Sequence, residues 1–369
     1  MAMRRLFPLL FILVTVTIQP ALAAGTITLT EPTHRSSSGV FFDNSLAELI
    51  SPSGRLGLLL FDRSGRNQTW IIDVALLEEI ADLADGYTYL DSDGKEVVVP
   101  ELVLADIWVN TLKSATKGGS LFALPYGNPS VATLSRIAPQ ELSVYRTLAQ
   151  ERLSAILGKP AKPTTQSGSA SPSDAAINTY LPLRNSMEIV NTVVTLKSIE
   201  DQRLKLAQLL NIDLDKNRLN QLRTDLRNSV DQTTKKVRVS GGNYTITSQR
   251  YELPVTIINS FDQQVNLDVR ITPTNSRVLI GNIPRVSIGA QSQLQIKVPL
   301  NIIASGDTTL RIQLWTPAGE RIGEQGRIPL RLTVISSSTT WFATTMALIL
   351  IFALITQSVR RVKRRRENG

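Results

Sequence analysis

The chain has 369 residues, of which 42% are hydrophobic, and this length exceeds that of a usual single domain. It contains no cysteine and a single histidine, His34. These counts exclude disulfides, thiol nucleophiles and zinc sites of the Cys/His type, and any Ser-His-Asp triad would have to use His34. The formal net charge of +9 would suit a nucleic-acid binder, so its distribution along the chain decides that question.

Residues 1–23 have the pattern of a secretory signal peptide. Arg4 and Arg5 precede an apolar run over residues 6–18, and small residues follow. We expect cleavage after the last residue of this segment, in a site made of Ala21, Ala23 and Ala24. The apolar run is short for a membrane span, which makes a retained N-terminal anchor the less favoured alternative.

Residues 340–359 carry no charge and predict a single C-terminal transmembrane helix, in preference to a buried core helix. A basic tail follows at residues 360–369, and under the positive-inside rule it would be cytoplasmic. We expect the residues that anchor this helix at the membrane interfaces to be Trp341, Arg360, Arg361, Lys363, Arg364, Arg365 and Arg366. The tail would act as a stop-transfer anchor or, alternatively, attract anionic lipid headgroups.

Most of the net charge belongs to the two ends of the chain. Of the +9, the signal carries two charges and the tail five, which leaves +2 on the exported body. A body so close to neutrality is not that of a nucleic-acid binder.

Residues 24–158 alternate apolar strands with amphipathic helices, which predicts a small exported α/β module with too few strands for a complete barrel. A buried strand at residues 70–72 leads into a helix, and Asp93-Gly94 suits the turn of a hairpin. Later elements are predicted at 101–112 (helix), 121–125 (strand), 130–136 (helix) and 142–156 (helix). Residues 159–175 lack large apolar groups and predict a flexible linker.

Two further regions complete the exported body. Residues 176–235 predict a helical hairpin, with helices at about 184–210 and 214–230. Residues 236–336 alternate apolar and polar side chains in about seven short strands, as in an immunoglobulin- or fibronectin-like β-sandwich. The expected fold class is therefore multidomain α+β: a small α/β module, a helical hairpin, the sandwich and one C-terminal transmembrane helix.

Catalytic motifs are sparse. Ser114-Ala115-Thr116-Lys117 matches S-x-x-K, but the downstream motifs of penicillin-recognising enzymes are missing. Asp91, Asp93 and Gly94 resemble the start of a calcium loop without its closing glutamate, so a turn is favoured. Five carboxylates of the α/β module would be able to form an acid/base pair of the glycosidase kind: Asp62, Asp73, Glu78, Glu79 and Asp106. Asp73 equally suits a helix N-cap, and the two glutamates suit a solvated helix face, so we predict no catalytic residue, cofactor or metal ligand.

Residues 123–131 (ALPYGNPSV), 244–248 (YTITS) and 252–259 (ELPVTIIN) carry a resemblance. With the predicted membrane helix and basic tail, they resemble uncharacterised actinobacterial single-pass membrane proteins whose genes neighbour that of the lipid II flippase. The resemblance is strongest over residues 236–366, weaker over 69–135 and absent from the first sixty. It implies a bacterial cell-envelope setting near peptidoglycan assembly and supplies no mechanism. Members of that family are longer and have a larger α/β domain. Because this chain has only a fragment of that domain, an enzymatic activity inherited with it is less expected.

The leading hypothesis is a non-enzymatic type I single-pass cell-envelope protein, with its body outside the cytoplasm and its C-terminus inside. It would be a scaffold or binding module for peptidoglycan-precursor assembly, integral to the membrane, with the lipid II flippase, other cell-wall assembly proteins or an envelope glycan as partners. The first alternative is a carbohydrate-active enzyme, or its remnant, that uses carboxylates in residues 60–160. The second is a structural spacer, for which residues 24–158 would be dispensable.

Overall fold

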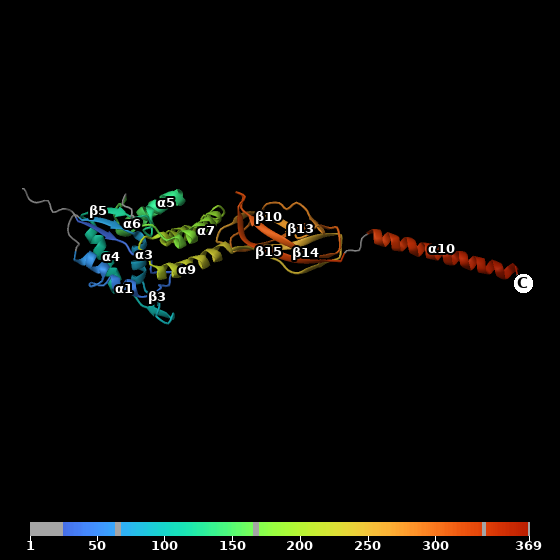
Figure 1. Cartoon of the computed structure of the whole chain (residues 1–369), viewed down its shortest axis with the longest axis horizontal. Helices are drawn as coiled ribbons and strands as arrows, with labels where there is room; N and C mark the ends of the chain where they lie inside the picture. Colours follow the sequence, from blue (N-terminus) through green and yellow to red (C-terminus); the bar gives the residue numbers. More distant parts are fainter. Residues whose placement is uncertain (1–24, 63–67, 165–169, 334–336, 368–369) are drawn as a thin grey trace, which may run out of the picture.

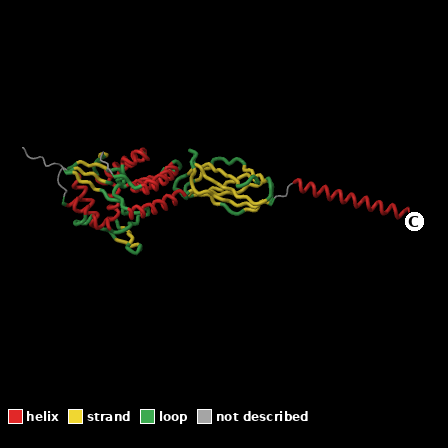
Figure 2. The backbone as a smooth tube through the Cα atoms, in the orientation of Figure 1, coloured by secondary structure: helices red, strands yellow, loops and turns green. Residues whose placement is uncertain are grey.

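The computed structural model describes residues 25–62, 68–164, 170–333 and 337–367. The expected signal peptide, with Ala21, Ala23 and Ala24, lies outside these residues. Figure 1 shows the regions following one another along the long axis of the molecule: an α/β module, a bundle of helices, a β-sandwich and a long C-terminal helix. The tube in Figure 2 separates the helical and strand-rich parts.

Four parallel strands form the sheet of the α/β module, in the order β1-β2-β5-β6. Their bounds are β1 Thr26–Leu29, β2 Thr69–Ile72, β5 Ser120–Ala123 and β6 Lys162–Pro163. Trp70 and Ile72 on one face of β2 and Ile71 on the other are all buried, as expected for a central strand covered on both faces. Each strand lies beside the next one in the chain, with helices between them, which is the winding of half a (β/α)8 barrel. The strand β6 falls within the segment expected to be a linker.

The helices that connect these strands begin and end at residues suited to those positions. Asp73 caps the N-terminus of α3, Ser130 caps that of α5, and Gly158 ends α6 with a φ of 66°. A hairpin turns at Gly94, which has a φ of 75°. The bounds are α1 Ser45–Leu49, α2 Arg55–Phe61, α3 Val74–Ala84, β3 Tyr87–Leu90, β4 Glu96–Val99, α4 Val103–Thr116, α5 Val131–Ile137 and α6 Pro139–Leu157.

The helical bundle contains more helices than the two expected. Its elements are α7 Asp174–Asn191, α8 Lys197–Ala207, the 3-10 turn η1 Gln208–Leu210 and α9 Lys216–Thr234. The chain leaves the helical path between α7 and α8, at the run Val193-Val194-Thr195, where three β-branched residues lower helix propensity. The hydroxyls of Tyr145 on α6 and Tyr180 on α7 lie 3.1 Å apart and join the bundle to the α/β module.

Two sheets form the sandwich, in the orders β12-β10-β14-β15-β8 and β11-β13-β9-β7. Inward-facing residues alternate with exposed ones, for example in β9, and β9 pairs antiparallel with β13 from Asn259↔Ser292 to Arg250↔Asn301. This two-sheet arrangement is that of an immunoglobulin-like sandwich. The bounds are β7 Val237–Ser240, β8 Tyr244–Ile246, β9 Arg250–Asn259, β10 Val265–Pro273, β11 Val278–Ile280, β12 Val286–Ile288, β13 Ser292–Ile302, β14 Gly306–Trp315 and β15 Arg321–Leu332.

The prediction of a transmembrane helix at residues 340–359 is wrong. The chain does form a helix there, α10 (Ser337–Glu367), but none of the helices in the described parts of the chain is both long enough and apolar enough to cross a membrane. The uninterrupted apolar run extends only from Met346 to Ile355, and its ten residues rise about 15 Å, half of the ~30 Å needed. Thr345 and Thr356 bound this run, and their hydroxyls donate to backbone carbonyls one turn earlier.

The expected interface anchors all belong to α10. Trp341 is 66% exposed, and the six basic residues from Arg360 to Arg366 lie on its last turns, where the backbone is described to Glu367.

Candidate functional site

The carboxyl ends of β1, β2 and β5 place polar groups along one edge of the parallel sheet, the edge at which barrel enzymes hold their active sites. Asp73 follows β2 directly and is fully buried. Its Oδ1 accepts from the backbone nitrogens of Ala75 at 3.1 Å and Gly127 at 2.9 Å, while its Oδ2 has no hydrogen-bond partner. Burial raises the pKa of Asp73 to about 7, against the opposing effect of those two hydrogen bonds.

Glu79, on α3, fixes the segment that follows β1. Its side chain is buried and accepts from the Thr33 hydroxyl and, at 2.9 Å, from the His34 backbone nitrogen. The His34 ring is also buried; its Nδ1 lies 3.0 Å from the Ser45 hydroxyl, and its Nε2 has no partner. Asp43 lies beside the same ring, 3.7 Å from its Nδ1, and this polar contact, with hydrogen bonds from Ser45, holds the pKa of Asp43 well below its usual range. These groups hold the loop in place.

The helical bundle closes this edge of the sheet. Asn211, just after η1, donates from Nδ2 to the Gly127 carbonyl at 2.8 Å, and the Ser130 nitrogen donates to the Leu210 carbonyl at 2.9 Å. Gly127 has a φ of 75°, and a Cβ there would lie 2.7 Å from Cγ of Gln208. The turn η1 therefore packs directly against the loop that follows β5 and covers this part of the edge.

A separate cavity of about 580 Å³, which we call the junction pocket, lies between the α/β module and the bundle. Its volume is within the usual range for ligand sites, but those are mostly apolar, whereas no aliphatic side chain lines this one. The lining comprises Arg35, Ser37, Ser38, Gly39, Glu78, Asp82, Tyr126, Arg152, Lys197, Ser198, Asp201, Gln202, Lys205, Ser229 and Thr233.

Arg152, on α6, connects the two sides of the junction pocket. Its guanidinium bonds to Glu78 of α3 at 3.1 Å and to Asp201 of α8, and it lies 5.7 Å from the centre of the Tyr126 ring. The Tyr126 hydroxyl donates to Glu78 at 2.6 Å. This network fixes the pocket's wall, because each carboxylate is held by groups from two elements.

The other charges of the lining are unevenly matched. Arg35 pairs with Asp82, and Lys197 lies 3.5 Å from Asp201. Lys205 instead donates to the Ser36 and Ser37 carbonyls, both at 3.3 Å, and no carboxylate of the described residues lies within ion-pairing distance of its ammonium. Burial lowers the pKa of Lys205. Glu200, outside the lining, also pairs with Arg152 at 3.3 Å, so the charges around the pocket balance overall. Among the described residues, Lys205 is the one cation of the lining without an ion pair.

The residues singled out from the sequence are only partly brought together. Asp73, Glu78 and Glu79 converge at the start of α3, whereas Asp106 is exposed on α4, where it accepts from Asn110, and Asp62 is exposed at the end of α2. Ser114 bonds back to its own helix, and Asp91 accepts from two backbone nitrogens of its turn. No metal-binding group of three His, Cys, Asp or Glu side chains occurs among the residues the structure describes.

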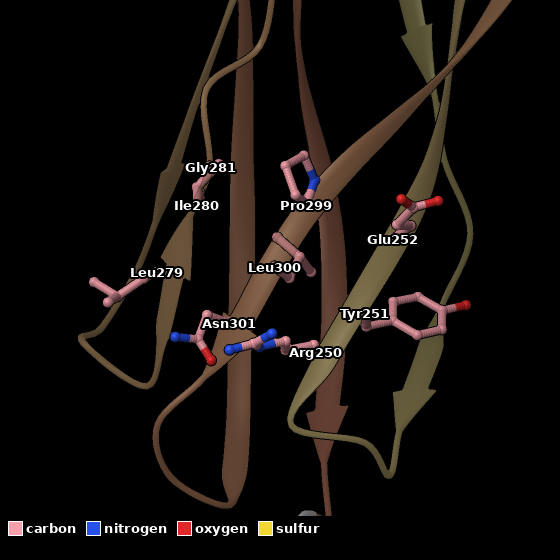
Figure 3. Close-up of a pocket in the computed structure, with 9 residues that line it drawn as sticks. All are labelled: Arg250, Tyr251, Glu252, Leu279, Ile280, Gly281, Pro299, Leu300 and Asn301. Atoms are coloured by element: carbon pink, nitrogen blue, oxygen red, sulfur yellow. The ribbon is translucent and has the colours of Figure 1, made fainter.

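A second cavity, of about 450 Å³, lies on the sandwich (Figure 3). Residues of β9, β11 and β13 line it, with Leu279 56% exposed and Leu300 buried at its base. In Figure 3 the side chain of Leu279 points away from the other labelled residues. This cavity lacks the buried charged network of the junction pocket.

The family of unknown function DUF6049 matches residues 138–367, which include all of α6, the bundle, the sandwich and α10. No curated protein matches the chain. The chain belongs to this uncharacterised family.

Similar solved structures include a C. elegans MSP family member, WR4, at 11% identity with a TM-score of 0.21, covering 27% of this chain and 98% of that one. The PapD-like domain 7 of human CEP192 is similar at 9% identity with a TM-score of 0.22, over 28% and 88% of the two chains. E. coli α2-macroglobulin is similar at 15% identity with a TM-score of 0.21, over 26% of this chain and 6% of its own length. At these TM-scores the similarities support no conclusion.

Proposed function

We propose that this DUF6049 protein is a non-enzymatic protein of the cell envelope that serves as a binding or scaffold module in the assembly of peptidoglycan precursors. The observation that carries the proposal is the contact of the helical bundle with the carboxyl edge of the parallel sheet. The turn η1 contacts Gly127 and Ser130 where a barrel enzyme would admit its substrate. The buried carboxylates of that edge are engaged in fixing loops.

The setting of the proposal comes from the sequence. The N-terminal segment has the pattern of a secretory signal, and the resemblance to proteins encoded beside the lipid II flippase favours the peptidoglycan pathway. Partners would be proteins of that assembly or an envelope glycan, and the near-neutral body argues against nucleic acid.

The test is crosslinking of the tagged full-length protein in its native host, followed by affinity purification and mass spectrometry. The matched control is a tagged, unrelated exported protein at equal abundance. We expect specific recovery of the lipid II flippase or of precursor-assembly enzymes. A deletion strain with normal growth, wall composition and precursor pools, together with no recovery above the control, would contradict the proposal.

One observation favours a second function, that of a carbohydrate-active enzyme. A buried carboxyl with its pKa raised to about 7, like that of Asp73, is what a general acid requires. Wall glycan incubated with the wild type, with Asp73→Asn and with the exposed-turn control Asp93→Asn would separate the two functions. Cleavage by the wild type and by Asp93→Asn, but not by Asp73→Asn, would favour the enzyme, whereas no cleavage by any of them would favour the binding module.

A further inference from the structure

The junction pocket has the chemistry of a site for a charged, strongly hydrated ligand. Hydroxyl and amide groups line it, and the buried ones are tied together: Gln202 donates to the Ser229 hydroxyl at 2.5 Å and accepts from the Thr233 hydroxyl at 2.9 Å. The paired charges around Arg152 add donors and acceptors in fixed positions. A peptide with apolar side chains would find no aliphatic contact in this lining, whereas the hydroxyls of a saccharide would find many partners.

Lys205 adds a requirement for negative charge. Its ammonium is held by two carbonyl oxygens at 3.3 Å, long contacts that offset little of the cost of partial burial. The nearby carboxylates are already engaged: Asp225 accepts from the nitrogen and hydroxyl of Ser37, and Asp201 accepts from Arg152 and Lys197. A ligand anion in the pocket would supply the missing partner and form a charge-assisted hydrogen bond.

We infer that the junction pocket binds an acidic saccharide, with the carboxylate or phosphate of the sugar against Nζ of Lys205 and its hydroxyls against the serine, threonine and glutamine lining. This inference deepens the proposed binding function and rests on it. Burial and then the nearby charge of Arg35 lower the pKa of Lys205, against the opposing effect of Asp225, Glu79 and Asp201. Binding should therefore weaken as the pH rises and the ammonium loses its proton.

Calorimetric titration of the full chain tests the inference with defined probes. The acidic probes are N-acetylmuramic acid, glucuronic acid and glucose 6-phosphate; the neutral ones are N-acetylglucosamine and glucose; inorganic phosphate is the anion without a sugar. We expect one or more acidic sugars to bind at least tenfold more tightly than the neutral sugars and than inorganic phosphate. Comparison of the carboxylate with the phosphate sugars identifies the anion.

Variants assign the binding to the ammonium of Lys205. Lys205→Met keeps most of the length of the side chain and should lose at least tenfold in affinity. Lys205→Arg should retain binding, and Lys235→Met, at an exposed pair outside the pocket, should match the wild type. Unfolding midpoints check that each variant is folded. If Lys205→Met does not fold, the test is binding that weakens at high pH in the wild type but not in Lys205→Arg.

Two outcomes would overturn the inference. In the first, no acidic sugar binds at millimolar concentration. In the second, a folded Lys205→Met binds the acidic sugar as tightly as the wild type does. If Lys205→Met still crosslinks to assembly proteins, the proposed function stands although the saccharide inference fails. If the wild type does not crosslink to them either, both the proposed function and the inference fail.

Discussion

The backbone nitrogen of Gly127 donates to Oδ1 of Asp73 at 2.9 Å, and the carbonyl of the same glycine accepts from Asn211 at 2.8 Å. A buried carboxyl at the end of β2 is thereby connected through one residue to the turn η1 that closes the sheet edge. The protonation state of Asp73 therefore bears on the contact between the α/β module and the bundle.

Asp73 should make the α/β module less stable as the pH rises. Its pKa is raised in the folded chain from 3.8 to about 7, so between these values the folded state binds a proton that the unfolded state does not. The free energy of unfolding then falls by about 4 kcal/mol from pH 4 to pH 8 and, for this group, levels off above. Asp73→Asn keeps the cap and removes this fall.

The effect of Asp73 is checked by urea unfolding between pH 4 and pH 8, with the fluorescence of the buried Trp70 and Trp108 as the readout. The quantity of interest is the difference between wild type and Asp73→Asn, since other carboxyls contribute equally to both. Asp93→Asn, in an exposed turn, should follow the wild type. If the difference in free energy of unfolding between wild type and Asp73→Asn does not change with pH, Asp73 does not titrate as predicted.

Gly127→Ala should loosen the contact between the α/β module and the bundle. The added Cβ would lie 2.7 Å from Cγ of Gln208, and the φ of 75° is strained for alanine. We expect a loss of about 2–4 kcal/mol in the free energy of unfolding, of which the φ contributes about 1.

Gly94→Ala is the matched control for Gly127→Ala, because Gly94 has the same φ of 75° and no atom within 4 Å of its Cβ position. The additional loss of unfolding free energy at Gly127, relative to Gly94, measures the close contact with Gln208. Adding Gln208→Ala to Gly127→Ala should recover part of this loss. Equal losses at both glycines would mean that η1 does not press on Gly127.

Much of the fold follows from local sequence signals. The alternation in β9 and the Asp73 cap are short-range patterns, and both have the predicted roles in the structure. The junction pocket has no such signal, because Arg35, Arg152 and Lys205 come from distant segments and each alone resembles a solvated charge. At α10, the absence of charge suggests a membrane span, but the threonines shorten the apolar run. The break between α7 and α8 has no local signal, because apolar residues continue through it.

Arg152→Ala should destabilise the junction between α3, α6 and α8. Its side chain is 18% exposed and holds Glu78 and Asp201, so its removal leaves the partly buried Glu78 without its cation. We expect a loss of about 2–3 kcal/mol, with little response to added salt. Lys235→Ala breaks the exposed i,i+4 pair with Asp231 and should cost less than about 0.5 kcal/mol. Chemical unfolding at low and high salt measures both losses of stability. If Arg152→Ala loses as little as Lys235→Ala, Arg152 does not stabilise the junction between these helices.

Asn259→Ala should destabilise the sandwich end nearest the bundle. The Asn259 side chain is 1% exposed; its Nδ2 donates to the carbonyls of Gln263 and Gly289 at 2.8 and 2.7 Å, and its Oδ1 accepts from the Phe261 nitrogen at 3.0 Å. Alanine would leave the buried Phe261 nitrogen and the two partly buried carbonyls without this partner, at a cost of about 2–4 kcal/mol. The exposed Asn301, on β13 of the same sheet, provides the control Asn301→Ala, expected within about 0.5 kcal/mol of wild type. Amide hydrogen exchange in residues 259–263 and 288–292 should rise in Asn259→Ala alone; unchanged protection there would mean that other contacts hold the two loops together.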